Sequence, residues 1–286
     1  MTHSSAATKL ILQAPPGELL EVVASTRSLL GDAAVDAVVA AAAREHNLAH
    51  LVCLELPGGG KVLLCSAAEL DSSGALFLEP RTAQAVTVDH ARQVVTAVRP
   101  ATAAETGAPG AEPHRRALES ALATYVSASY AQHGTAAVFA TGTGAALSLT
   151  ICLSSASASL KNFWAGAAHS RWEVSTTPGG AALRGHLAST VHYFEDGNVQ
   201  LATSHCATAT APCDCADPPA FAEAVVAALR ATESDYFGGL EATFDALAER
   251  SLKELRRALP VTRARFPWEN TAAKLAGELR AKEAAL

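Results

Sequence analysis

The stretch ALRGHLASTVHYFEDGNVQLATSH, residues 182–205, decides the fold of this chain because it reads as a complete β-hairpin. Two strand-forming runs, 182–194 and 198–205, flank the turn sequence Glu-Asp-Gly-Asn. Asp-Gly and Gly-Asn pairs accept the positive φ angles that tight hairpin turns require. The two runs are therefore expected to pair as antiparallel strands.

Three more strand-like segments precede this hairpin. They span residues 135–140, 147–153 and 170–176, and turn-forming residues separate them at 141–144 and 178–180. Because such short links reverse the direction of the chain, each strand is expected to pair antiparallel with the next. The region therefore predicts a five-stranded antiparallel meander, and helical patterns on both sides of it make the fold class α+β.

Helical patterns dominate the N-terminal part of the chain. Pro15 and Pro16 suit the start of a helix that continues to about Leu30, where Gly31 is a plausible stop. A second helix is expected over 33–46, with a third short one over 48–51, and antiparallel helices joined by short links predict a bundle or stalk. The apolar stripe of the first helix comprises Leu19, Val22, Val23, Thr26, Leu29 and Leu30.

The segment between this stalk and the sheet has a mixed pattern. A short strand is expected near residues 62–66, and the Pro-, Gly- and Ala-rich residues 100–113 indicate an exposed linker. A helix is expected over 114–131, with one apolar side formed by Leu118, Leu122, Tyr125 and Val126.

A long helix is expected to follow the sheet. Asp217 is a good N-cap, Pro218 is a good first residue, and the helical pattern continues to Pro260. The pair Gly238-Gly239 should weaken or bend this helix by roughly 1 kcal/mol per glycine. Its apolar row comprises Phe221, Val225, Leu229, Leu240, Phe244, Ala248 and Leu252.

A second amphipathic helix is expected at the C-terminus. Pro267 can open it, and its apolar residues Trp268, Ala272, Leu275, Leu279 and Leu286 recur at helical spacing. It can be a reaching arm, or it can pack back onto the body of the protein. The predicted parts of the chain are an N-terminal helical stalk (1–60), a mixed globule and linker (61–113), a helix with the antiparallel sheet (114–216), a long helix across the sheet (217–259) and a C-terminal extension (260–286).

The charge distribution marks one end of the chain. Residues 251–265 carry five basic side chains (Lys253, Arg256, Arg257, Arg263 and Arg265) against Glu254, a local charge of +4 in a protein of net charge −6. The remaining residues therefore sum to −10. Lys253, Arg256 and Arg257 share one helical face, which favours a docking site for an acidic partner over the ordinary charged end of a solvated helix.

The sequence contains no convincing catalytic or metal motif. PGGGK (57–61) lacks the glycine and Ser/Thr positions of a phosphate loop and fits a hairpin turn, and TGTG (141–144) leads into a strand rather than a helix. Cys213 and Cys215, with His205 and Cys206 upstream, are closer together than zinc ligands usually are, so loop cysteines are the better interpretation. No catalytic residue, cofactor or metal is predicted.

The composition points to a globular protein of the cytoplasm. The chain has 286 residues, of which 49% are hydrophobic, and no apolar run approaches the roughly 18 residues that a membrane span needs. The N-terminus lacks the pattern of a signal peptide, and the six cysteines show no disulfide framework spacing. Reduced thiols in a cytoplasmic protein are therefore expected.

Five segments together resemble one known family. They are APPGE (14–18), FLEPR (77–81), KNFWAG (161–166), VHYFEDGNVQL (191–201) and LRRALPVTRARFPW (255–268). In this order and at this spacing they are similar to the F-actin capping protein alpha subunit family, from about residue 9 to the C-terminus.

The resemblance implies an obligate heterodimer with a homologous beta subunit, bound to the barbed ends of actin filaments in the cytoplasmic cytoskeleton. Helical stalks, one sheet shared across the dimer and a C-terminal extension called a tentacle are the implied architecture. The implied actin-binding residues are Lys253, Arg256, Arg257, Arg263, Arg265, Trp268, Leu275 and Leu279. The implied action is steric, so no enzyme is expected. Regulators of capping protein and anionic phosphoinositides are further partners that the resemblance allows, and nucleic acid is not expected.

Two other readings of the basic run remain. One is a scaffold subunit that caps an actin-like filament, as in dynactin; the other is an anionic-lipid or nucleic-acid binder. The chain also departs from the family pattern: residues 165–172 read AGAAHSRW, Pro267 precedes Trp268, and Gly238-Gly239 lies within the long helix. None of these departures touches the basic residues.

Overall fold

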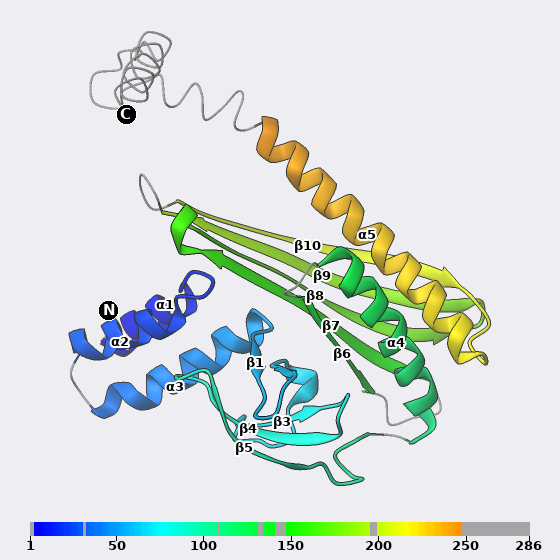
Figure 1. The fold of residues 1–286 in the computed structure, drawn as a ribbon, viewed down its shortest axis with the longest axis horizontal. Helices are drawn as coiled ribbons and strands as arrows, with labels where there is room; N and C mark the ends of the chain where they lie inside the picture. The colour runs from blue at the N-terminus through cyan, green and yellow to red at the C-terminus, as the bar shows by residue number, and fades with distance from the viewer. Residues whose placement is uncertain are drawn as a thin grey trace, which may run out of the picture. The chain divides into compact units, whose positions relative to one another are not determined.

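The computed structural model describes residues 3–30, 33–107, 109–130, 134–140, 147–194 and 199–246. The chain forms two compact units, Met1–Thr232 and Glu233–Leu286, and the boundary lies within helix α5 (Pro218–Ala246). The first unit contains all the strands and helices α1 to α4 (Figure 1). None of the described helices is both long enough and apolar enough to cross a membrane.

The five-stranded sheet is the antiparallel meander that the sequence predicts. Its order is β10-β9-β8-β7-β6, so each strand pairs with its neighbours along the chain (Figure 1). Three strands, β7, β8 and β10, extend well beyond their predicted ends, because small Ala and Ser residues continue the pairing. Ser154 to Ser159, for example, pair with His169 to Trp164. The strands are β6 (Gly134–Ala140), β7 (Ser148–Ser159), β8 (Trp164–Thr177), β9 (Gly180–Tyr193) and β10 (Val199–Pro212).

One face of this sheet carries the larger apolar side chains and lies against helices. Within the first unit, α4 (Glu112–Ser129) and the start of α5 lie on this face (Figure 1). The two helices also contact each other, because the Arg230 guanidinium lies 5.2 Å from the centre of the Tyr125 ring. The predicted apolar rows are buried at Leu118, Leu122, Tyr125 and Val126 of α4 and at Phe221, Val225 and Leu229 of α5. Helix α5 continues through Gly238-Gly239 to Ala246 without a break.

Trp172 fills the centre of the same face and requires a glycine on the next strand. It is fully buried and lies directly opposite Gly185 of β9. A Cβ atom at Gly185 would lie 2.5 Å from two carbon atoms of the Trp172 ring. Only glycine therefore fits beneath this ring without a shift of the core.

Replacing Gly185 by alanine is expected to destabilise the protein by about 1–3 kcal/mol, because the Trp172 ring must move within a close-packed core. Urea unfolding followed by tryptophan fluorescence measures this loss. Gly110→Ala is the matched control, since a Cβ atom there meets nothing within 4 Å. Equal unfolding midpoints for the two variants would contradict the assigned packing.

The N-terminal stalk has three helices, α1 (His3–Leu12), α2 (Leu19–Leu30) and α3 (Ala33–Ala49). Helix α1 was not predicted; its Ala7 and Ile11 are fully buried. The predicted short helix over 48–51 is wrong, because α3 continues to Ala49 and Leu51 then turns with a φ of 46°. The apolar stripe predicted for α2 is only partly buried, since the Leu29 side chain is 77% exposed. The stalk core comprises Ile11, Ala14, Leu19, Val23, Val39, Ala42, Ala43 and Ala91.

Two small sheets form the globule between the stalk and the large sheet. The PGGGK segment is the hairpin turn of the first, with φ between 89° and 102° at Gly58, Gly59 and Gly60. Phe77 and Val86 of the second sheet share a buried core with Phe139 of β6. The globule therefore packs on the face of the large sheet opposite α4. Its elements are β1 (Cys53–Glu55), β2 (Lys61–Leu63), β3 (Leu76–Glu79), β4 (Gln84–Asp89), β5 (Val94–Pro100) and the short helices η1 (Ser66–Ala68) and η2 (Pro109–Ala111).

Candidate functional site

The residues predicted to bind actin lie beyond Ala246, outside the residues that the structure describes. Their role therefore stays a prediction. They are Lys253, Arg256, Arg257, Arg263, Arg265, Trp268, Leu275 and Leu279. The predicted turn at 141–144 and the turn Glu195 to Asn198 also lie outside the described residues.

Two of the family-like segments meet where the stalk contacts the large sheet. Glu18, from APPGE, precedes α2, and His192, from VHYFEDGNVQL, lies near the end of β9. The imidazole Nδ1 of His192 donates a hydrogen bond of 2.6 Å to the carboxylate Oε1 of Glu18. His192 is 3% exposed, so this bond fixes the start of α2 against the sheet from a protected position.

A third segment, KNFWAG, joins the same place through a strained turn. Phe163 follows the short helix η3 (Leu160–Asn162) and has a φ of 55°, a left-handed conformation that non-glycine residues rarely adopt. Its carbonyl accepts a hydrogen bond of 2.9 Å from the backbone N–H of Phe194. The two rings lie edge to face at 6.0 Å, and Phe194 also contacts His192 at 5.1 Å. We call Glu18, Phe163, His192 and Phe194 the motif junction.

An exposed apolar strip begins next to the motif junction along β9, on the face of the sheet opposite His192. Tyr193 of β9 lies between Trp164 of β8 and Val199 of β10, and Leu201 follows two residues along the same face. The exposed fractions are 40% for Tyr193, 52% for Val199 and 42% for Leu201. Contiguous exposed apolar side chains on a sheet typically mark a surface that another protein covers.

Strand β10 is the outer strand of the sheet on this side. It has 14 residues, pairs with β9 over its whole length, and carries no Asp, Glu, Lys or Arg. No strand within the described part of the chain pairs with its outer edge. Long edge strands that lack charges or bulges are open to pairing with a further strand. The exposed strip and this edge together form a candidate surface for association.

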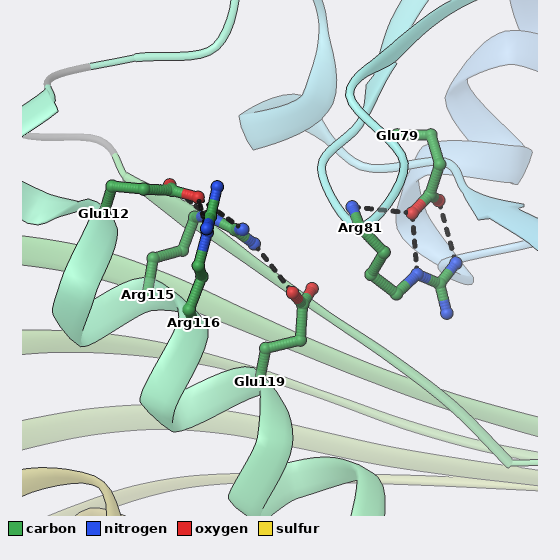
Figure 2. Close-up of polar contacts among 6 residues, drawn as sticks. All are labelled: Glu79, Arg81, Glu112, Arg115, Arg116 and Glu119. Carbon is green, nitrogen blue, oxygen red and sulfur yellow. Dashed lines mark hydrogen bonds and ion pairs between the residues drawn. The ribbon is translucent and has the colours of Figure 1, made fainter. Parts of the chain in front are cut away.

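The FLEPR segment contains a buried ion pair with a structural role. Glu79 is 1% exposed, and its two carboxylate oxygens accept hydrogen bonds of 2.6 and 2.8 Å from the Arg81 guanidinium (Figure 2). Arg81 also donates to the Lys61 carbonyl, which connects β3 to β2. Removing Arg81 would leave the Glu79 carboxylate buried without its compensating charge, which is strongly unfavourable.

A second charge network lies on α4, near this ion pair (Figure 2). Arg115 holds Glu112 through hydrogen bonds of 2.7 and 2.9 Å and Glu119 through one of 2.9 Å, while Arg116 donates to Glu112 at 2.6 Å. The Arg115 and Arg116 guanidinium groups lower the pKa of Glu112 to about 2. Burial raises the pKa of Glu119. Arg81 and Glu119 both line a cavity of about 620 Å³ beside α4, so the networks frame this cavity.

Three imidazoles in ring-to-ring contact link the end of α3 to β8. The His46 and His50 rings lie 4.4 Å apart, and the His50 and His169 rings lie 5.7 Å apart. Burial lowers the pKa of both His50 and His169 to about 4, and neighbouring imidazoles add to this effect. His186 of β9 is the other imidazole that affects His169. The folded state therefore keeps the rings of His50 and His169 neutral.

The free energy of unfolding is expected to fall as the pH falls from about 6.5 towards 4. A histidine with a lowered folded-state pKa contributes its full stability above its unfolded pKa and loses it in acid, because the unfolded chain takes up protons first. His169 alone should account for about 2 kcal/mol between pH 7.5 and pH 5. Urea unfolding at the two pH values measures this difference. His169→Gln should reduce this loss of unfolding free energy, whereas His205→Gln, at an exposed position, should not. An equal change of unfolding free energy between the two pH values in both variants would contradict the assignment to His169.

The cysteine pair of the β10–α5 loop takes part in ordinary loop contacts. The Cys215 thiol donates a hydrogen bond of 3.0 Å to the Gly180 carbonyl, and burial raises the pKa of Cys213. Within the described ranges, no three or more His, Cys, Asp or Glu side chains come together as metal ligands.

Comparison with known proteins decides the family. The sequence model described as "F-actin capping protein alpha subunit" matches residues 7–278 of this chain. The chain belongs to the F-actin capping protein alpha subunit family. The match includes all the segments that form the motif junction and the buried ion pair.

Individual capping protein alpha subunits are similar over nearly the whole chain. The F-actin-capping protein subunit alpha of Arabidopsis thaliana is 35% identical over 273 residues, covering 91% of this chain and 86% of its own. That of Dictyostelium discoideum is 30% identical, covering 96% of both chains. A solved structure, the homodimeric actin capping protein alpha subunit from Plasmodium berghei, has the same fold with a TM-score of 0.73, 19% identity, and coverage of 90% of this chain and 96% of its own.

The structure gives the capping protein alpha motifs a physical explanation that the sequence alone did not reveal. APPGE, KNFWAG and VHYFEDGNVQL are far apart in sequence, yet they meet at the motif junction. No spacing rule connects Glu18 with His192. A carboxylate and an imidazole are suitable hydrogen-bond partners, but nothing in the sequence places these two residues together.

Proposed function

We propose that this chain is the alpha subunit of a heterodimeric capping protein that binds the barbed ends of actin filaments and blocks both the addition and the loss of actin subunits. The observation that carries the proposal is the family match over residues 7–278. The function places the protein at the actin cytoskeleton. Blocking an end by occupying it requires no covalent step, so we assign no catalytic residue and no cofactor.

We assign the contact with actin to the C-terminal region. Lys253, Arg256 and Arg257 provide positive charge at the end of the long helix, and Arg263 and Arg265 continue it beyond Pro260. These cations would dock on acidic surfaces of the terminal actin subunits. The apolar side of the terminal helix, with Trp268, Leu275 and Leu279, would then lie in an actin groove.

We assign the association surface to β10 and the exposed apolar strip. A homologous beta subunit would add its own strand to the outer edge of β10 and cover Tyr193, Val199 and Leu201, which removes apolar surface from water. The edge is long enough, at 14 residues, to continue the sheet across a dimer.

A second copy of this chain is the alternative occupant of the same surface. The Plasmodium berghei alpha subunit is described as homodimeric, so alpha subunits of this fold can associate without a beta subunit. Light scattering on this chain expressed alone separates the two assemblies. A stable dimer of this chain that excludes a beta subunit would overturn the heterodimer proposal.

Actin elongation from preformed filament seeds tests the function. The chain co-expressed and purified with a beta subunit is expected to stop barbed-end growth at substoichiometric concentration. The chain expressed alone is expected to leave growth unchanged. Unchanged elongation in the presence of the purified complex would contradict the proposal.

A further inference from the structure

The face of the large sheet opposite α4 is hollowed beside the end of α3. A cavity of about 610 Å³ is bounded there by the end of α3, the turn after β2, and strands β8 and β9. Its polar lining is dominated by Arg171, Arg184, His169 and His186, with Glu173 as the acidic residue. Neither the motif junction nor the exposed apolar strip contributes to this lining, so the capping function leaves the cavity unexplained.

The strand register brings the basic side chains together. Arg171 of β8 lies directly opposite His186 of β9, and Glu173 lies directly opposite Arg184. Directly opposed residues of an antiparallel pair share a face, and diagonal neighbours are within reach of long side chains. Arg171 and Arg184 are such diagonal neighbours. Two guanidinium groups and an imidazole are therefore available to one ligand.

The charges around the cavity are not balanced. Arg171 donates a hydrogen bond of 2.8 Å to the Ser66 hydroxyl and lies 3.6 Å from the Glu173 carboxylate, which is 63% exposed. The Arg184 side chain has neither a hydrogen bond nor an ion pair within the described ranges. One carboxylate thus faces two permanently charged guanidinium groups, so the cavity has a net positive charge.

A buried imidazole lacks a partner in the same wall. His169 is 9% exposed, and its Nδ1 atom has no hydrogen-bond partner among the described residues. A buried polar atom without a partner costs free energy, and a water molecule or a ligand in the adjoining cavity can supply the missing hydrogen bond. This observation is independent of the arginine cluster and favours an occupied cavity.

We propose that this cavity binds an oxyanion of the phosphate class through Arg171, Arg184 and His186. Planar guanidinium groups donate in pairs to phosphate oxygens, and His186 supplies a third donor from the neighbouring strand. Donors on three side chains from two strands match a tetrahedral anion better than a planar carboxylate. Leu48 and Leu51 complete the wall, and the volume leaves room for the organic part of a phosphate monoester.

Calorimetric titration of inorganic phosphate into the full-length chain, purified with its partner subunit, tests this site. Ionic strength is held constant with chloride, and acetate serves as the carboxylate probe. Arg184→Gln is the decisive variant because Arg184 is exposed and holds no other group in place. Arg92→Gln is the matched control, since it removes the same charge from an exposed position that does not line the cavity.

We expect saturable phosphate binding. Arg184→Gln should weaken it about tenfold, because a charge-assisted hydrogen bond is lost. Arg92→Gln should leave it unchanged. Equal effects of the two variants would overturn the site, because any phosphate would then bind elsewhere. Acetate binding as tight as phosphate binding through Arg184 would overturn the assignment to the phosphate class. The readout involves no actin, so a purified complex that fails to cap filaments would still test this site.

Discussion

Replacing Arg257 and Arg263 by glutamate is expected to raise the concentration needed for half-maximal capping by about a hundredfold. Two attractive contacts with acidic actin surfaces become repulsive, and like charges brought together at an interface cost several kcal/mol. Each 1.4 kcal/mol corresponds to a factor of ten in affinity. The elongation rate of seeded filaments, measured against the concentration of the purified dimer, gives this value.

The control carries the same change of charge at a distance from the basic run. Lys9 and Arg92 are exposed in the stalk and the globule, so Lys9→Glu with Arg92→Glu alters the net charge equally. This variant should cap like the wild type. That result would show that capping depends on local contacts of the basic run and not on the net charge of the protein. If the Arg257 and Arg263 variant assembles normally and also caps like the wild type, the charge-based contact is wrong.

Replacing Val199 and Leu201 by aspartate is expected to abolish co-purification with the beta subunit. These side chains are 52% and 42% exposed in this chain, so the change should leave its own fold intact. In the proposed dimer they are buried, where each contributes about 1.5–3 kcal/mol and where an unpaired carboxylate is strongly unfavourable. Affinity purification of the co-expressed subunits, followed by size-exclusion chromatography, measures the effect.

Val94→Asp with Val98→Asp is the matched control for this experiment. These valines belong to β5 of the globule and are 41% and 37% exposed, so they introduce the same chemistry on a different sheet. The control should retain the beta subunit. A normal yield of dimer from the Val199 and Leu201 variant would show that association uses a different surface.

The large sheet could be predicted because its signals are local. Short turns between strand-like runs reverse the chain direction, so consecutive strands pair antiparallel. The predicted meander order is confirmed. Strand length was underestimated where Ala and Ser residues fill the ends, as in β7 after Leu153, since their own preferences are weak and the neighbouring strand determines their conformation.

Contacts between distant segments could not be predicted in the same way. Helix α1 lacks a proline entry and an acidic first turn, and burial of Ala7 and Ile11 against the stalk is what stabilises it. The bond between Glu18 and His192 depends on how the stalk meets the sheet, which no periodicity encodes. The actin-binding residues after Ala246 rest on charge pattern and family resemblance, and they stay predictions.

Microscopy of single growing filaments tests the central claim most directly, because it distinguishes the two filament ends. We expect the purified dimer of this chain with a beta subunit to stop growth at the barbed end while the pointed end continues to elongate. Continued growth at the barbed end in the presence of saturating dimer would contradict the account.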